Sequence, residues 1–238
     1  MKKFLLSIPC FLIAAQVLAQ DCSQYLYLQK NKTIEMTAYN KKGDVVAKTV
    51  STVSNVSTSK GTTTANVVTE SFDKKGKSMG TISTDYQCNG NGLSMQMHID
   101  GQKQPVTMDV KVNKTSGDPE YPANMKVGDH LPDYTSQVQM ISGMVSTVKF
   151  TDRVVLAKED LSTPAGTWSC FKISYKSSNT TAFTKSNSDT VNKATSMFGK
   201  LGIKMPASTI ETTIWYAPGF AVVKVENKNS VIEITGIK

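Results

Sequence analysis

The residues that could perform chemistry are few. The chain has only two histidines, His98 and His130. Asp129 precedes His130, and a carboxylate beside an imidazole can serve proton transfer, but neighbours on an extended chain point to opposite sides. Neither histidine accompanies a nucleophile elbow, a phosphate-binding loop or a zinc-protease motif. The sequence therefore predicts a protein that is not an enzyme, with no catalytic residue, metal or cofactor, and with Asp129 capping a loop.

The methionines of the chain suggest that the protein binds a ligand and does not catalyse a reaction. The chain has 11 Met. Two of them, Met95 and Met97, lie at every second position together with Leu93 and Ile99 on a segment predicted to be a strand. Alternation places them on the inward face. Filling the core is the ordinary role of such residues, and a pliable lining for a hydrophobic ligand is the alternative. Met95, Met97 and the adjacent His98 are the candidate ligand-binding residues.

The N-terminus has the pattern of an export signal. Lys2 and Lys3 precede an apolar stretch from Phe4 to Leu18, and Ala19 ends a cleavage motif. Residues 1–19 are predicted to be a signal peptide. The apolar stretch is short for a bilayer span of about 20 residues. We expect an exported protein that is periplasmic, outer-membrane-associated or extracellular, and not an integral membrane protein.

Removal of the leader leaves three cysteines, Cys22, Cys88 and Cys170. In an oxidising compartment the simplest arrangement is one disulfide and one buried thiol. The three cysteines allow other pairings, but a Cys22–Cys88 bond is favoured because it would tie a loose N-terminus to the end of a strand. Cys170 lies two residues after Trp168 on a predicted strand, so it shares a face with Trp168, and it is expected to be a small core residue.

The basic charge of the chain does not indicate a nucleic-acid partner. Loss of Lys2 and Lys3 with the leader lowers the formal charge from +8 to +6. The remaining lysines are spread over turns without a five-residue basic run, as expected for a solvated surface. The alternative is a weak attraction of the lysines to anionic glycans or lipopolysaccharide.

Strands joined by short turns dominate the chain. Residues 33–112 are predicted to form an antiparallel meander of six strands, because each polar turn contains a glycine suited to a hairpin. One corner occurs twice, as Tyr39-Asn40-Lys41-Lys42-Gly43 and, 33 residues later, as Phe72-Asp73-Lys74-Lys75-Gly76. In both copies the Asx residue can bond the turn backbone.

A break rich in proline and glycine is predicted at residues 113–133. Further strands are expected at 134–142, 144–157, 166–177, 208–216, 221–227 and 231–237. Residues 178–189 read as a polar stretch, and 192–200 as either a short helix or a loop. The predicted fold is all-β, an antiparallel meander of about 11 to 13 strands that forms a highly twisted half-barrel or barrel-like sheet. Residues 20–238 would be one domain, with two possible halves (20–115 and 130–238) that share one core.

Two segments carry a family resemblance. The sequences Thr163–Ile173 and Trp215–Lys224, with the two Lys-Lys-Gly corners, resemble the TapB-like exported proteins of Bacteroides-type bacteria, within a broader domain-of-unknown-function family. The resemblance covers most of the mature chain. It implies a secreted or periplasmic β-protein without an established activity, and it brings no catalytic residues. In that context Asp189-Thr190-Val191 resembles an O-glycosylation motif, so Thr190 is a candidate modification site.

These observations favour a non-enzymatic binding module of the cell envelope. Its ligand would be hydrophobic or a glycan, or its partner an envelope protein, held against the concave side of the sheet. A structural or adhesion component of the surface is the alternative. A hydrolase is third, since any two of the 19 acidic residues could meet in space.

Overall fold

A computed structural model describes residues 22, 25–89, 92–99, 110–111, 121–122, 124–139, 144–183 and 209–238. The predicted signal peptide (1–19), Thr190 and the segment 192–200 lie outside the described residues. The predicted all-β class is confirmed.

The elements are the 3-10 helix η2 (Leu26–Leu28) and the strands β1 (Thr33–Asn40), β2 (Val45–Ser59), β3 (Thr62–Asp73), β4 (Ser78–Asn89), β5 (Gly92–Ile99), β6 (Val110–Lys111), β7 (His130–Leu131), β8 (Tyr134–Gln139), β9 (Met144–Thr163), β10 (Gly166–Phe183), β11 (Thr209–Ala217), β12 (Ala221–Asn227) and β13 (Ser230–Ile237).

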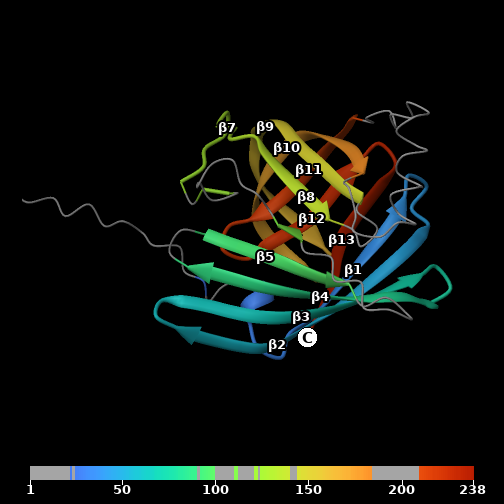
Figure 1. The fold of residues 1–238 in the computed structure, drawn as a ribbon. Coiled ribbons are helices and arrows are strands. Elements are labelled where there is room, and N and C mark those ends of the chain that lie inside the picture. The colour runs from blue at the N-terminus through green and yellow to red at the C-terminus, as the bar shows by residue number, and fades with distance from the viewer. Residues whose placement is uncertain are drawn as a thin grey trace, which may run out of the picture.

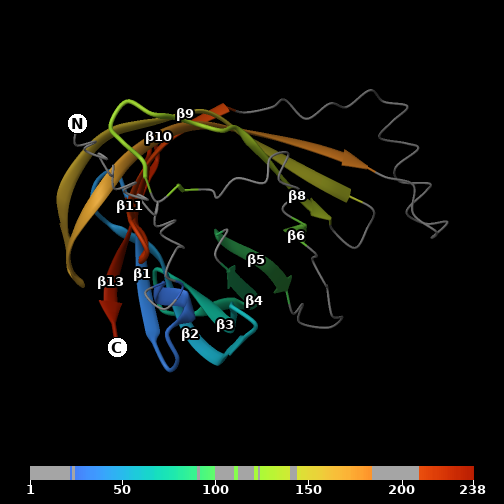
Figure 2. The same ribbon diagram turned by 90° about the vertical axis from the view of Figure 1, so that its left-hand side faces the viewer.

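All the strands belong to one antiparallel sheet. Its order is β5-β4-β3-β2-β1-β13-β12-β11-β10-β9-β8-β6, and β7 pairs with β9 beside β8. The first five strands and the six from β8 to β13 are two meanders, which the pairing of β1 with β13 joins into one surface. The sheet is not closed, and its twist and coiling bend it into an arc that runs from β5 through β1 and β13 to β9, β8 and β6 (Figures 1 and 2).

The predicted strands differ from the structure in three details, which concern the pairing of β6, the presence of β7 and the length of β10. The meander of the first half has five strands, because β6, its expected sixth, pairs with β8. The predicted break contains β7, which pairs with β9 in two residues and ends at Pro132, where a ladder donor is lost. Strand β10 runs to Phe183 because its polar Ser and Thr residues continue the ladder with β9.

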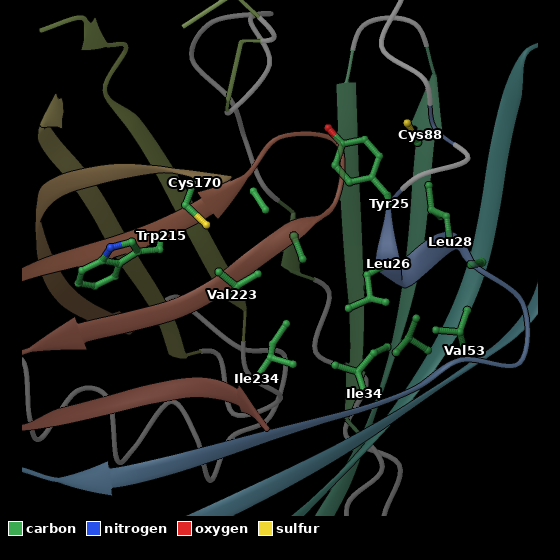
Figure 3. Packing of buried hydrophobic residues seen from close by; sticks show 14 residues of the cluster. Tyr25, Leu26, Leu28, Ile34, Val53, Cys88, Cys170, Trp215, Val223 and Ile234 are labelled. Carbon is green, nitrogen blue, oxygen red and sulfur yellow. The ribbon is translucent and has the colours of Figure 1, made fainter. Parts of the chain in front are cut away.

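The first core cluster is shared by both halves of the sheet. It contains Ile34 and Val53 from the first half and Val223 and Ile234 from the second, each at most 1% exposed. Figure 3 shows these side chains meeting Leu26 of η2. The helix lies on the inner side of the arc beside β2 and β3 (Figure 2).

The structure has a second core cluster in addition to the one that both halves share, whereas one shared core was predicted. It contains Val155, Phe171, Ile173, Ile214 and Tyr216, covered by Met125 and Leu131. Neighbouring residues of β10 and β11 enter different clusters: Cys170 and Trp215 belong to the first, and Phe171 and Tyr216 to the second. Since consecutive side chains of a strand point to opposite faces, the sheet is buried on both faces at this point.

The N-terminal segment is fixed covalently and by hydrogen bonds. Cys22 and Cys88 form the predicted disulfide, across 66 residues of chain. The backbone N–H of Leu26 donates to the carbonyl of Phe220 at 3.0 Å. Cys170 is a buried free thiol, as the sequence predicts. The bond to Cys88 therefore holds η2 against the first half of the sheet, and the hydrogen bond holds it against the second.

Candidate functional site: the aromatic cluster around Arg153

The two histidines lie on different halves of the sheet. His98 is on β5, opposite Ser83, and His130 is on β7, opposite Val154. The Asp129 carboxylate accepts the backbone N–H of Lys126 at 2.7 Å, so it is the predicted loop cap. No group of three or more His, Cys, Asp or Glu in the described part of the chain is arranged to hold a metal ion.

The candidate methionines are placed by their strand alone. Met95 pairs with Tyr86 and Met97 with Thr84 in the ladder of β4 and β5. The side chains of Met95, Met97 and His98 lie outside what the structure describes. A ligand-lining role for these three residues therefore stays a prediction.

Arg153 is the centre of a site that the sequence patterns did not predict. It is the only arginine of the chain, lies on β9, and is 3% exposed. Its guanidinium carbon lies 4.9 Å from the ring centroid of Tyr134 and 5.5 Å from that of Tyr121. Nη1 donates to the carbonyl of Pro132 at 2.7 Å. The two rings and the carbonyl offset the cost of burying the charge.

Aromatic rings extend from Arg153 in two directions. On one side Tyr134 stacks on Phe150, with ring centroids 4.3 Å apart, and Phe150 meets the edge of Tyr175 at 5.6 Å. We call Tyr134, Phe150 and Tyr175 the aromatic strip. It crosses β8, β9 and β10 in spatial order.

On the other side the rings lead to the N-terminal segment. Tyr121 stacks on Tyr216, with centroids 4.3 Å apart. The hydroxyl oxygens of Tyr216 and Tyr25 are 3.4 Å apart. Tyr25 and Tyr216 are buried, 5% and 3% exposed, so this branch is core structure and not a surface for a ligand.

Local irregularities of the strands place these rings. The edge of β9 is covered by β7 and β8, which are separated by Pro132 and Asp133, and Tyr134 then pairs with Phe150. The register of β9 and β10 shifts between Ser174 and Lys176. Bulges re-aim side chains, so the shift allows Tyr175 to approach Phe150.

The chemistry that the strip offers is stacking. Tyr134, Phe150 and Tyr175 are each only partly buried, so all three residues have some contact with solvent. The ionisable neighbours are an exposed ion pair, Lys176 Nζ to Asp152 Oδ2 at 2.9 Å. The hydrogen bond from Lys176 to Asp152 raises the pKa of the lysine, which keeps it protonated and unsuited to act as a base. Partly buried rings beside a fixed cation suit the apolar faces of lipids or sugars.

Trp215 forms a second polar cluster on the opposite face of β10 and β11. Its indole N–H donates to Glu159 Oε1 at 2.7 Å, and Lys224 and Lys172 lie 4.6 Å and 5.2 Å from its ring. The ring itself is 6% exposed. These contacts satisfy the indole N–H and cover the ring of this buried tryptophan, so little of its surface is accessible to a ligand.

A signal for the Arg153 cluster was present in the sequence. A single arginine among 26 lysines, inside a strand and not in a turn, indicates a position that needs a planar cation. The rings that meet it come from residues 121 and 134, in and just after the predicted break, so their approach depends on tertiary structure that alternation does not reveal.

Comparison with known proteins gives a family and a fold. A family model described as DUF3108-like matches residues 29–236. A crystal structure of a protein from Bacteroides fragilis, assigned as exported and as having a YmcC-like fold, is similar with a TM-score of 0.60 and 18% identity, covering 90% of this chain and 98% of that one. A protein from Parabacteroides distasonis assigned as a lipoprotein is similar with a TM-score of 0.60 and 16% identity, covering 92% and 100%. No curated protein matches the chain.

Two findings bear on location. A disulfide fits a compartment outside the cytoplasm, where thiols are oxidised. Within the described residues, no helix has the length and apolar character needed to cross a bilayer.

Proposed function

We propose, from the premise that this chain belongs to the DUF3108-like family, that it is a non-enzymatic binding module of the cell envelope whose aromatic strip contacts a hydrophobic or glycan ligand. The observation that carries the proposal is the partly buried stack of Tyr134, Phe150 and Tyr175 beside the buried Arg153. Sugar rings and apolar chains present C–H groups that pack on aromatic faces, and such contacts need no proton transfer.

The placement of the strip supports binding over core packing. Its three rings lie on neighbouring strands, so the strands and not a loop hold their spacing. Arg153 fixes the corner between β7 and β8 through the Pro132 carbonyl. A site on rigid elements binds without a large ordering cost.

The cellular setting of the proposal is the envelope of a Gram-negative bacterium. The relatives from Bacteroides fragilis and Parabacteroides distasonis are assigned as an exported protein and a lipoprotein. The Cys22–Cys88 bond is consistent with that setting. The finer assignment to TapB-like proteins rests on the sequence resemblance, and we retain it as part of this proposal.

The test is binding to defined probes. We expect protein purified from its host to bring a bound mass in native mass spectrometry, or to bind oligosaccharides or a fatty acid in calorimetry. Phe150→Ala and Tyr175→Ala are expected to weaken that binding by about tenfold each, on the scale of one lost aromatic contact.

A matched control separates binding from folding. Phe220→Ala removes a half-buried ring that stacks on Trp168 away from the strip. It should lower stability while leaving affinity unchanged. If the strip variants bind every probe as the wild type does, the strip is structural and the proposal fails.

The other two hypotheses have separate tests. A structural or adhesion role predicts a stable envelope partner in pull-downs from envelope extract. Hydrolysis predicts turnover that is lost in His130→Ala.

A further inference from the structure

The two Lys-Lys-Gly corners are the same device, folded twice. In the first, the Asn40 side-chain oxygen accepts the backbone N–H groups of Lys42 and Asp44 at 2.9 Å and 3.0 Å. In the second, Asp73 Oδ1 accepts those of Lys75 and Lys77 at 2.8 Å and 2.9 Å. Gly43 and Gly76 have φ of +85° and +78°, which favours glycine at both positions.

Each corner is followed by a bulge that carries an exposed apolar residue. In the β1–β2 ladder Tyr39 pairs with Val45 and Ala38 with Ala47, so Val46 is the extra residue. In the β3–β4 ladder Phe72 pairs with Ser78 and Ser71 with Gly80, so Met79 is the extra residue. Val46 and Met79 stand three residues after the corner glycine in both copies, and they are 42% and 59% exposed.

The sheet brings these corners side by side. Ala47 pairs with Asp73, so both hairpins end on the same side of the molecule, at the right of Figure 1. Asn40 pairs with Ser230, which adds the β12–β13 turn on the other side of the first corner. We call these three turns and the bulges the hairpin end.

The exposed side chains of the hairpin end are basic and apolar. Its exposed lysines are Lys41, Lys42, Lys74, Lys75, Lys77 and Lys228. Three apolar side chains stand among them, since Val45 is also 44% exposed. The acids there are engaged. Glu226 pairs with Lys41 at 2.9 Å, which lowers the pKa of the carboxyl, and Asp73 accepts backbone N–H groups. Asp44, the exposed acid of the first corner, accepts the side-chain amide of Asn40 at 3.0 Å. No acid among the described residues forms an ion pair with Lys42, Lys74 or Lys75.

We propose that the hairpin end docks on an anionic phospholipid surface, with Lys42, Lys74 and Lys75 against the headgroups and Val46 and Met79 inserted between them. Charge complementarity identifies this partner, because lysines flanking exposed apolar side chains match a surface that is anionic outside and apolar beneath. Neither signal alone gives firm attachment, and here the same bulged hairpin supplies both, twice.

The docking surface is separate from the aromatic strip. It lies on strands β1 to β4 and the β12–β13 turn, whereas the strip lies on β8 to β10. The inference therefore does not depend on the ligand proposed above, and each can fail without the other.

The experiment is sedimentation of the protein with vesicles of phosphatidylcholine, or of an equimolar mixture of phosphatidylcholine and phosphatidylglycerol. We expect binding to the mixed vesicles at low ionic strength and its loss at about 1 M salt, where the Debye length is about 3 Å. The triple change Lys42→Gln, Lys74→Gln and Lys75→Gln should weaken the partition constant by on the order of 100-fold, roughly fivefold per lysine.

Two variants isolate the surface and its apolar part. The control Lys30→Gln, Lys126→Gln and Lys149→Gln removes the same charge from exposed positions elsewhere and should change binding by less than a few-fold. Val46→Ser with Met79→Ser should weaken binding about tenfold without changing its salt dependence.

Two results overturn the proposal. One is equal binding, or none, to neutral and mixed vesicles by the wild type. The other is an equal loss in both lysine variants, which would assign the attraction to net charge. Vesicle binding that survives the Val46 and Met79 changes would remove the insertion from the proposal and leave electrostatic attachment alone.

Discussion

Cys170 shows what burial on both faces of a sheet does to one thiol. Its side chain is fully buried, and its Sγ lies 3.5 Å from the carbonyl oxygen of Trp168. Burial, with the nearby Asp160 and Glu159 carboxylates, raises the pKa of the thiol to about 11. The thiolate is the reactive form, so Cys170 is a structural residue at neutral pH.

A pH-dependent prediction follows for this thiol. The unfolded chain releases the Cys170 proton near pH 9, and the folded chain only near pH 11. Stability from this group is therefore complete below pH 9 and is lost as the pH rises toward 11. Thiol labelling of the native protein should be negligible at pH 8 and immediate in denaturant, as followed with a chromogenic disulfide reagent. Rapid native labelling at pH 8 would contradict the burial.

At the scale of elements, the disulfide attaches the segment that contains η2 covalently to the sheet. The bond closes a loop across 66 residues, from the segment before η2 to the end of β4. In the loop-entropy model such a closure contributes about 4 kcal/mol.

Cys22→Ser is therefore expected to lower the free energy of unfolding by about 4 kcal/mol, measured in urea. Cys88 would remain as a buried thiol, so little packing is lost. Wild-type protein kept under strong reducing conditions is the control and should unfold at the same urea concentration as the variant. An unchanged midpoint in both would mean that Leu26 and Leu28 hold the segment without the bond.

At the scale of the whole molecule, the pairing of β1 with β13 joins the two meanders into one sheet. Ile34 of β1 and Ile234 of β13 are fully buried in the shared cluster. Each half of the sheet would expose its side of this cluster if the other half unfolded. The two meanders should therefore unfold together, although each is large enough to suggest a separate domain.

Ile234→Ala tests this coupling. It should cost about 2–5 kcal/mol, as large-to-small changes in a core do, and still give one transition. Fluorescence of Trp168 and Trp215 reports on the second half, and far-UV circular dichroism on the entire sheet. The half-buried Ile232→Ala is the control and should cost less. Separate midpoints for the two signals would show independent halves.

The sequence predicted local structure well because its signals are local. Alternation and the Gly-containing corners predicted every hairpin from β1 to β5. The odd number of cysteines predicted one disulfide, and the need to tie down the N-terminus favoured the Cys22–Cys88 pair. The short strands β6 and β7 were misplaced because their partners, β8 and β9, are set by tertiary packing.

The candidate site was less accessible to sequence reasoning. Arg153 meets Tyr121 and Tyr134 only after the β7–β8 edge folds onto β9. The hairpin end was visible as a repeated corner, but its two bulges depend on register, which residue type does not fix.

The position of β13 also bears on how the protein reaches its native state. Its partner β1 lies almost 200 residues earlier, with Asn40 opposite Ser230 and Ile34 opposite Ile237. Contacts of such high sequence separation form late and slow folding. During that delay the backbone of β1 is a free edge on which other chains could add a strand. Glu35, a charge on that edge, discourages such pairing, and a chaperone that shields β1 should raise the yield of native protein.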